Sequence, residues 1–556
     1  MISSFQLRFG RSPGAAGEDI SATTVTIFVG PNNSGKSQVL REIERHCRMG
    51  QKDANDRLLA ELTFRGLDQA RASQSIERIR TPPYPGEAQQ VDHIFVGSKY
   101  GRQQVSFTTL AQVIQAPATN LPFFCQSYLR HLTLMLDGFS RIGLVSPQAA
   151  GDLQRAPESS LQVLFQDDVK RAEVRRIILD AFGRHFVVDP TKIGQFRIRL
   201  SERAPRNDLE ERGLHADAVR FHAAAQMIEE TSDGVKAFTG IVTEVIAGDP
   251  SILLVDEPEA FLHPSLASKL AQEVARAAQL ANKRVFASTH SPQFVMGCIQ
   301  SGATLNIIRL TYTAGVATAR VLPNEEILDL MRHPLLRSTG VLNGLFYEFV
   351  VITEGDADRA FYQEVNERLL QFKPEWGIPN CLFLNAQNKQ TVHTMLRPLR
   401  KLGIPAAGVV DVDILKDGGS DWKNLLSSAD VPELSHGSLA TMRTAVKTAM
   451  DATGKDMKRD GGVAILGGNE RQAAEDLLNQ LSQYGIFVVP GGELESWMKN
   501  IGAIDHGPRW LIDIFERMGE DPSKANYVRP NTDDVWAFVR NIQSWLVDPK
   551  RKGIPA

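Results

Sequence analysis

The feature that most constrains this 556-residue chain is a glycine-rich segment near its start. Residues 24–30 form a short β-branched run that predicts a strand, and residues 36–47 predict a helix. Between them the chain fits the pattern G-x-x-x-x-G-K-[ST] at every fixed position. In this pattern backbone N–H groups turn inward around phosphates, the lysine supplies a positive charge, and the last hydroxyl can ligate Mg²⁺. The sequence thus predicts an α/β domain with a phosphate-binding loop formed by Gly30, Asn32, Asn33, Ser34, Gly35, Lys36 and Ser37.

A second apolar run should supply the partner of this loop. Residues 251–256 are nearly all aliphatic, which is typical of a strand buried on both faces of a parallel sheet. A helical pattern and a third strand at 284–288 follow, so the order is strand, helix, strand. Asp256 at the strand end is predicted to hold Mg²⁺ through water, and Glu257 to orient and polarise the attacking water.

Two more segments fit a nucleotide site. His290 ends the third strand, where it could reach the γ-phosphate and report hydrolysis. Ser232 and Gly234 open a helix upstream of Asp256, where hydroxyl and N–H groups can serve a γ-phosphate held by another subunit. Taken alone, each segment is equally explained as a loop or a helix cap, but the phosphate-binding loop favours the functional interpretation.

These four motifs, in this order, resemble the ATP-binding-cassette (ABC) ATPases, in particular the soluble branch of recombination and SMC-like proteins. The resemblance covers about residues 1–335, and the run 257–264 is similar to that branch's extended second motif. It implies that Ser232 and Gly234 complete the ATP site of a partner subunit, so that the chain forms a dimer or tetramer. The usual glutamine-containing loop has no evident place, since four glutamines in the plausible window lack a distinctive context: Gln89, Gln90, Gln103 and Gln104.

A stretch with helical rather than strand-like periodicity interrupts this domain at about 145–215. Within it, apolar residues at i, i+3, i+4, i+7 and i+8 predict an amphipathic helix: Val174, Ile177, Ile178, Ala181 and Phe182. We expect a helical insertion here, which either packs on its own domain or serves self-association. A domain boundary is expected at 323–340, where polar and loop-prone residues break the pattern.

A second α/β block carries carboxylates after three predicted strands, at 347–353, 406–410 and 485–489. The acidic residues are Glu354 and Asp358, Asp411 and Asp413, and Glu493 and Glu495. Residues four apart can share a helix face, and alternate residues of an extended segment point the same way. Each pair alone is explained by a turn or a helix cap, but three groups at three strand ends favour a cage of hard oxygen ligands for Mg²⁺ or Mn²⁺.

This arrangement resembles the Toprim fold over about residues 345–500. An ABC head followed by Toprim is similar to the overcoming-lysogenization-defect (OLD) nucleases and to the nuclease subunit of Gabija-type anti-phage systems. The resemblance implies two metal ions, about 4 Å apart, that cleave a phosphodiester. Its implied ligands are Glu354, Asp358, Asp411, Asp413 and Glu493, with Glu495 competing for the last role.

Basic residues near this block have two interpretations. Lys389 and Lys499 either stabilise the scissile phosphate or are solvated. Arg397, Arg400 and Lys401 form either a solvated helix face or a salt-dependent contact to nucleic acid.

Composition excludes several classes of protein. Lys and Arg number 62 and Asp and Glu 65, a net charge of −3 that excludes a histone-like binder but not a local basic groove. The 4 cysteines show no metal-ligand spacing, which argues against a disulfide scaffold or zinc ribbon. No apolar run or signal segment suits a membrane or export, so we expect a cytoplasmic protein without membrane partners.

The expected fold class is therefore α/β: an ABC-type P-loop head with a helical insertion, a Toprim-like domain, and a helical cap over 501–556. The expected function is a DNA endonuclease of anti-phage defence, controlled by the ATPase head. It would use ATP with one Mg²⁺ (or Mn²⁺) and two more ions at the Toprim site. A helicase or another defence protein is the partner class that the resemblance allows. Two alternatives stay open: an ATP-driven clamp on nucleic acid without nuclease activity, and a Toprim RNase, for example one that cleaves tRNA and causes abortive infection.

Overall fold

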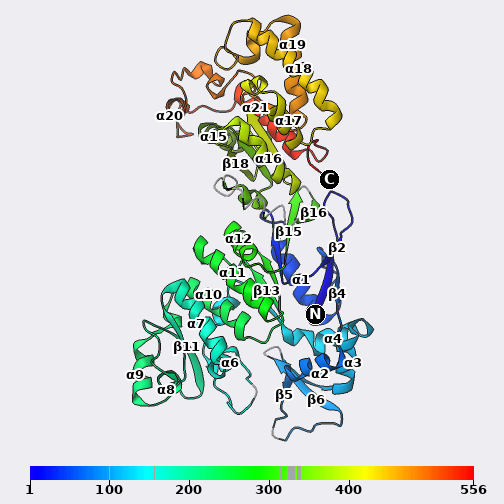
Figure 1. Cartoon of the computed structure of the whole chain (residues 1–556), viewed down its shortest axis with the longest axis vertical. Coiled ribbons are helices and arrows are strands. Elements are labelled where there is room, and N and C mark those ends of the chain that lie inside the picture. The colour runs from blue at the N-terminus through cyan, green and yellow to red at the C-terminus, as the bar shows by residue number, and fades with distance from the viewer. Residues whose placement is uncertain are drawn as a thin grey trace. The chain divides into compact units, whose positions relative to one another are not determined.

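The computed structural model describes most of the chain, namely residues 1–84, 86–98, 101–155, 157–313, 315–322, 328, 332, 334 and 340–555. The chain divides into two compact units, one of residues 1–29 and 33–324 and the other of residues 30–32 and 325–556. Figure 1 shows the chain coloured from the N-terminus to the C-terminus. Most of the boundary expected at 323–340 lies outside the described residues.

A six-stranded sheet forms the centre of the N-terminal unit. Its order is β16 (Val316–Leu322), β15 (Leu305–Thr313), β3 (Val25–Val29), β14 (Arg284–Ser288), β13 (Ile252–Asp256) and β8 (Thr133–Leu136). All neighbours are parallel except β16, which is antiparallel to β15. Parallel strands end at one edge of a sheet, so the segments that follow β3, β13 and β14 are brought together there.

The helices of this unit connect and flank these strands. In chain order they are α1 (Lys36–Met49), α2 (Gln69–Glu77), α3 (Phe107–Gln115), α4 (Leu121–Ser127), α5 (Ser140–Gly143), α6 (Ser160–Gln166), α7 (Asp168–Phe182), α8 (Asp208–Arg212), α9 (Ala216–Ala224), α10 (Asp233–Ala247), α11 (Pro264–Leu280) and α12 (Pro292–Gln300). The predicted amphipathic helix is part of α7. Asp167 caps its start by accepting from the Lys170 N–H, and Gly183, at φ 67°, ends it.

Three smaller sheets complete the unit. They are β2 (Asp19–Ser21), β1 (Ile2–Leu7) and β4 (Leu59–Phe64); β5 (Arg80–Thr81), β6 (His93–Ser98) and β7 (Gly101–Ser106); and β10 (His185–Asp189), β11 (Gln195–Ser201) and β12 (Gln226–Met227), with β9 (Gln148–Ala149) pairing with β11. The third sheet corrects one expectation. The segment 145–215 is not only helical, because it also contains the antiparallel strands β10 and β11. Both strands contain β-branched and aromatic residues, which favour strands.

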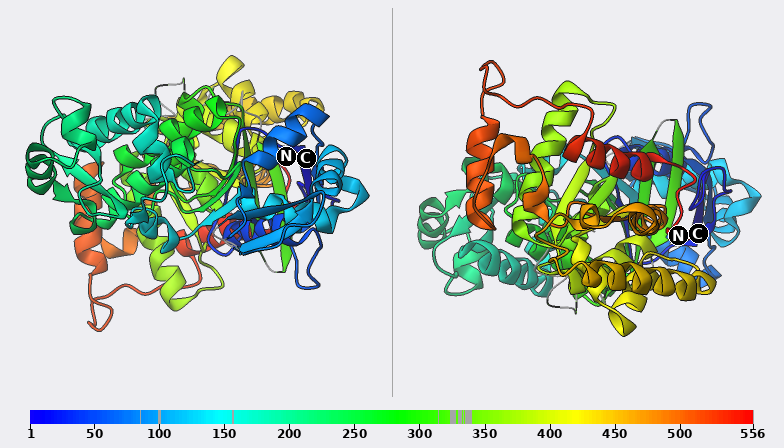
Figure 2. Two further views of the ribbon diagram at one scale, coloured as in Figure 1. Left: turned by 90° about the horizontal axis from the view of Figure 1, so that it is seen from below. Right: turned by 90° about the horizontal axis from the view of Figure 1, so that it is seen from above.

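The C-terminal unit is built on a four-stranded parallel sheet. Its order is β18 (Cys381–Asn385), β17 (Phe349–Thr353), β19 (Ala406–Val410) and β20 (Ile486–Val488). Its helices are α15 (Asp356–Phe372), α16 (Val392–Lys401), α17 (Gly419–Ser428), α18 (Glu433–Ala452), α19 (Gly468–Ser482), α20 (Pro508–Met518) and α21 (Asp534–Val547). The right-hand view of Figure 2 shows α21 in red beside α19 in orange. Because β17, β19 and β20 run parallel, the segments that follow them lie at one edge of this sheet.

The last helices of the chain pack into the core of this unit. Trp510, Trp536 and Trp545 are buried in one cluster with Phe361 and Phe487. Aromatic side chains bury the largest apolar areas, so these helices stabilise the sheet that carries the candidate metal centre.

Whereas Arg397 and Lys401 are exposed and their role stays a prediction, Arg400 fits neither interpretation of the basic cluster on α16. Its side chain is 1% exposed and donates to four backbone oxygens, those of Ala406, Ala429, Gly485 and Gly553. It is neither a solvated residue nor a contact for nucleic acid. A buried guanidinium needs such partners because its desolvation is costly.

Candidate ATP site and candidate metal centre

The phosphate-binding loop lies between β3 and α1, as expected. Gly35 directly precedes α1 and has φ 94°. A Cβ there would lie 2.8 Å from Leu58 Cδ1, so both the backbone angle and the packing favour glycine. Lys36, 5% exposed, follows it. Burial lowers the pKa of Lys36 to about 8, although Glu257, Asp256 and Glu259 act to raise it.

The two residues expected to hold Mg²⁺ meet at the sheet edge. The Ser37 hydroxyl donates to Asp256 Oδ1 at 2.8 Å. The Ser288 hydroxyl, at the end of β14, donates to the same oxygen. A hydroxyl and a carboxylate in contact are the donor set that a nucleotide-bound Mg²⁺ uses in P-loop ATPases.

Glu257 and His290 also face each other. His290 Nε2 lies 3.6 Å from Glu257 Oε1. Burial, and then the charge of Lys36, lower the pKa of His290, so its imidazole is neutral near pH 7. Glu257 has the left-handed φ of 50°, a conformation that costs a non-glycine residue energy and must be held by its surroundings.

Arg141 of α5 provides that support, and no sequence pattern pointed to it. Its side chain is 1% exposed. Its guanidinium donates to the backbone oxygens of Asp256 at 2.7 Å, Glu257 at 2.5 Å and Asp137 at 2.9 Å. Arg141 therefore holds the strand end on which both acidic residues of the ATP site sit. A single arginine in a four-residue helix has no spacing that could have revealed this role.

Glu259 is a second residue that was missed. Its Oε1 accepts from the His290 N–H at 2.7 Å and from the Thr289 hydroxyl at 2.8 Å. Burial raises the pKa of this carboxyl. Glu259 thus ties the loop after β13 to the loop after β14.

Ser232 and Gly234 lie at the start of α10, as the pattern predicted. A Cβ on Gly234 would come 2.5 Å from the Phe261 oxygen, so glycine allows α10 to pack closely on the segment after β13. Their role in a partner's ATP site stays a prediction.

None of the four candidate glutamines lies on a strand of the central sheet. Gln103 and Gln104 lie on β7 of a separate sheet, and Gln89 and Gln90 lie in the chain before β6. The strand beside β13 is β8, and it is followed by Asp137. An aspartate therefore stands at the strand end next to the Asp256 strand.

In the C-terminal unit, Glu354, Asp411 and Asp413 converge from the ends of β17 and β19. Each offers an oxygen within 4.8 Å of the others. Glu354 Oε1 accepts from the Asp411 N–H at 2.8 Å. Burial, and then the negative charge of Asp411, raise the pKa of Glu354 to about 8. Burial also raises the pKa of Asp411.

Asp358 is not one of the three residues of this group, although the charge of Asp411 acts on it, and its geometry differs from the one expected. The helix α15 begins at Asp356, so Glu354 precedes it and the two carboxylates do not share a helix face. Asp358 Oδ2 instead accepts from the Gly355 N–H at 3.0 Å. Burial, followed by the charge of Asp411, raises the pKa of Asp358 to about 7.

Glu493 and Glu495 form a second group with His506, which the sequence did not single out. His506 Nδ1 lies 2.7 Å from Glu495 Oε1 and 3.9 Å from Glu493 Oε1. The Gly507 N–H also donates to Glu495 Oε1 at 2.7 Å. Glu493 is 7% exposed, and burial raises its pKa. Since Glu495 already has these partners, the geometry favours Glu493 as the ligand of the two.

Two lysines lie among the carboxylates. Lys458 Nζ is 2.7 Å from Asp411 Oδ2, and Lys389 Nζ is 3.0 Å from Asp413 Oδ2 and 3.3 Å from Asp417 Oδ2. Lys389 was a sequence candidate, whereas Lys458 lies in a polar loop without a recognisable pattern. Lys499, the other candidate, is exposed.

The donor set fits divalent cations. Asp413 Oδ1 is buried and has no hydrogen-bond partner among the described residues. Burial, and then the negative charge of Asp411, raise the pKa values of Glu354 and Asp358, so the charged forms of these carboxyls are costly without a bound cation. Hard oxygen ligands of this kind suit Mg²⁺ or Mn²⁺.

Among the described residues, no helix is long and apolar enough to cross a membrane. All 4 cysteines are free, in line with the expected absence of a disulfide scaffold.

Comparison with known protein families adds two matches. Residues 162–296 match the family described as "AAA domain, putative AbiEii toxin, Type IV TA system". Residues 345–413 match "Overcoming lysogenization defect protein-like, TOPRIM domain". The first range includes Asp256 and His290 and begins after the phosphate-binding loop; the second includes Glu354 and Asp413. No curated protein matches the chain.

Three solved structures are also similar. An SMC head bound to the C-winged helix domain of ScpA has 12% identity and a TM-score of 0.35, covering 59% of this chain and 99% of its own. The SMC head domain from Thermotoga maritima has 13% identity and a TM-score of 0.30, covering 58% and 99%. An Smc head domain with an extended coiled coil, bound to the C-terminal domain of ScpA derived from Pyrococcus furiosus, has 11% identity and a TM-score of 0.31, covering 59% and 98%.

The two family matches and the sheets described above confirm the expected α/β fold class and the expected resemblance in both parts of the chain. An α/β ATPase domain precedes an α/β domain in which Glu354, Asp358, Asp411 and Asp413 lie within the matched Toprim range, whereas Glu493 and Glu495 lie beyond it. The chain is therefore similar to an AAA-type ATPase domain over residues 162–296 and to an OLD-like Toprim domain over residues 345–413, in the order that the resemblance implies.

Proposed function

We propose that the protein is an ATP-regulated endonuclease that cleaves DNA phosphodiesters with divalent metal ions and acts in anti-phage defence. The observation that carries this proposal is the meeting of Glu354, Asp411 and Asp413, which are far apart in the chain, within 4.8 Å. Buried carboxylates in such a group are costly unless a cation binds them. The matched Toprim family supports the same chemistry.

Each residue of the centre has a distinct part in this proposal. One ion would be held by four carboxylates, those of Glu354, Asp358, Asp411 and Asp413. A second ion would be shared between Glu493 and these carboxylates. Bound ions would supply activation of water and charge stabilisation of the leaving oxygen. Lys458 and Lys389 hold Asp411 and Asp413 in place and keep positive charge beside the scissile phosphate.

The ATPase part would control cleavage. Lys36 would contact the β- and γ-phosphates, Ser37 and Asp256 would hold the nucleotide's Mg²⁺, and Glu257 would orient the attacking water. His290, neutral and beside Glu257, would sense whether the γ-phosphate is present. Ser232 and Gly234 would complete the site of a second copy, so the active form would be a dimer or tetramer.

The test is a cleavage assay on the purified full chain. Plasmid, linear DNA and tRNA are incubated with Mg²⁺ or Mn²⁺, with and without ATP. The variants are Glu354→Gln and Lys36→Ala. Asp356→Asn is the matched control, because its exposed carboxylate pairs with Arg359 and is not part of the carboxylate group. We expect DNA cleavage that Glu354→Gln abolishes and Asp356→Asn retains.

Other results would support one of the alternative functions instead. Cleavage of tRNA alone would identify an RNase, and ATP-dependent DNA binding without any cleavage would identify a clamp. Cleavage that survives Glu354→Gln would overturn the nuclease assignment. Cleavage and ATP turnover that are unchanged in Lys36→Ala would overturn control by the ATPase part.

A further inference from the structure

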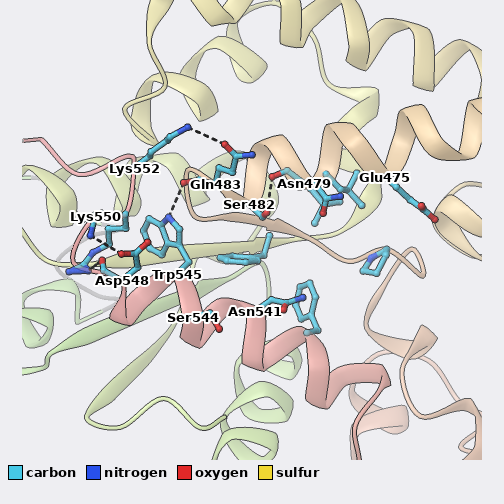
Figure 3. A pocket seen from close by; sticks show the side chains of 16 residues that line it. Glu475, Asn479, Ser482, Gln483, Asn541, Ser544, Trp545, Asp548, Lys550 and Lys552 are labelled. Carbon is cyan, nitrogen blue, oxygen red and sulfur yellow. Dashed lines mark hydrogen bonds between the residues drawn. The ribbon is translucent and has the colours of Figure 1, made fainter. Parts of the chain in front are cut away.

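A groove lies beside the edge strand β20 of the C-terminal unit, between α19 and α21. Its volume is about 810 Å³. The side chains of Phe487, Val488 and Trp545 contribute apolar surface to its lining. Figure 3 shows Lys550 and Lys552 at one end of the groove and Glu475 at the other.

The walls of the groove carry hydrogen-bonding groups and positive charge. Neutral polar side chains come from both helices, namely Asn479 and Ser482 of α19 and Asn541 and Ser544 of α21. The chain beyond α21 adds Lys550, Arg551 and Lys552. Asp548 is the nearby acid, and its Oδ1 already accepts from the Lys550 N–H at 2.8 Å. Amides, hydroxyls and lysines are the groups with which proteins contact phosphates and sugars.

One residue of the groove's lining lies near the candidate metal centre in the chain. Pro490 lines it and lies three residues before Glu493. Three residues of extended chain span at most about 11 Å. The lining therefore comes within about 11 Å of Glu493 at Pro490. The lysines lie at the end away from Glu475.

A peptide strand is a poorer fit to this groove. The edge strand β20 is three residues long, and Pro490 follows two residues later. Short edge strands and proline suppress the addition of another strand. The cationic end has no role in such an addition, whereas it suits a polyanion.

We propose that this groove binds the sugar-phosphate backbone of the nucleic-acid strand that leaves the metal centre. The inference rests on the proposed nuclease function and deepens it by assigning a contact surface for the substrate. In it, Lys550 and Lys552 contact phosphates, and the polar side chains of α19 and α21 contact phosphate and sugar oxygens. The contact is to the backbone and so does not select a base sequence.

The first experiment measures binding separately from cleavage. The affinity of a fluorescent 20-nucleotide DNA strand, and of the RNA of the same sequence, is measured by anisotropy across a salt series. All proteins carry Glu354→Gln so that the strand stays intact. The test variant is Lys550→Gln with Lys552→Gln. The control is Lys423→Gln with Lys524→Gln, which removes the same charge from two exposed lysines outside the groove.

We expect the test variant to bind more weakly and to lower the slope of log affinity against log salt by about 1.4, since each phosphate contact to a single strand contributes about 0.7. The control variant should change neither the affinity nor the slope. Equal affinity and slope in both variants would overturn the proposal. A test variant that loses oligomer mass while keeping its affinity would assign the groove to a second copy and would also overturn it.

A second experiment uses the wild-type centre. Ser544→Trp should fill the groove and reduce cleavage of long DNA at least tenfold, while hydrolysis of bis(p-nitrophenyl) phosphate, which needs no groove, stays unchanged. Val547→Trp, on the same helix but outside the lining, is the control. If Ser544→Trp cleaves long DNA like wild type, the groove proposal fails alone. If wild type hydrolyses neither substrate, the nuclease proposal fails, and the binding experiment still decides the groove.

Discussion

Replacing Arg141 by lysine tests how the ATP site is held together. The guanidinium, 1% exposed, donates to three backbone oxygens, and a lysine could keep the charge but satisfy only one of them well. Two partly buried carbonyls would then lack a donor, at about 1 kcal/mol each because water can partly replace it, so we expect a loss of about 2 kcal/mol in the stability of the unit.

The larger expected effect is on ATP turnover. Without Arg141, the left-handed Glu257 and the neighbouring Asp256 are no longer fixed at the strand end. Misplacement of a catalytic group by about 1 Å can reduce a rate about 100-fold. We therefore expect Arg141→Lys to lower kcat for ATP about 100-fold while the Kd for ATP changes less than about threefold, because Lys36 and the loop are untouched.

The assay measures phosphate release, ATP affinity by fluorescence, and urea unfolding on the same preparations. Arg171→Lys is the matched control. Arg171 is 4% exposed, donates to the oxygens of Leu164 and Phe165, and lies on α7, outside the ATP site. It should lose stability without losing kcat per folded molecule. If Arg141→Lys keeps a wild-type kcat, or if Arg171→Lys loses turnover equally, the positioning role of Arg141 is refuted.

Three further outcomes are expected. Glu354→Gln should lower DNA cleavage at least about 1,000-fold in a plasmid assay, with Asp356→Asn near wild type, because only the former supplies a metal ligand. The pKa of Glu354 in the metal-free protein is raised to about 8. Between about pH 4.5 and 8 the folded state therefore keeps a proton that the unfolded state has lost, and the Tm should fall as the pH rises through this range. Added Mg²⁺ should then raise the Tm more at pH 8 than at pH 6, and a flat response would contradict the coupling. Arg400→Met should lower the unfolding free energy of the C-terminal unit by about 3–5 kcal/mol in urea, since it removes a donor from four oxygens; a change below 1 kcal/mol would contradict its structural role.

Sequence patterns predicted the parts of the fold that depend on local chemistry. The strand before Gly30, the strand ending at Asp256 and the strands before Glu354 and Asp411 all form, because continuous apolar runs of four or five residues are buried on both faces. Strand ends place acidic residues at a shared edge, so the meeting of Glu354 with Asp411 followed from the topology.

Residues that act through long-range contacts could not be found in this way. Lys458 reaches Asp411 from a loop without periodicity, and His506 reaches Glu495 from a coil segment. Arg400 looked like one charge in a basic helix, but tertiary packing buried it against four carbonyls. The strands β10 and β11 were missed because the helical pattern just before them dominated the segment.

The parallel sheet of the C-terminal unit draws its parts from distant segments of the chain. The carboxylates at its edge come from residues as early as Glu354 and as late as Glu493, and its last strand, β20, pairs with β19. Arg400 in turn donates to the oxygen of Gly553, 153 residues later in the chain. A fragment that ends before Gly485, and so before β20, would therefore lack Glu493 and two of the four oxygens, those of Gly485 and Gly553, that satisfy the buried guanidinium.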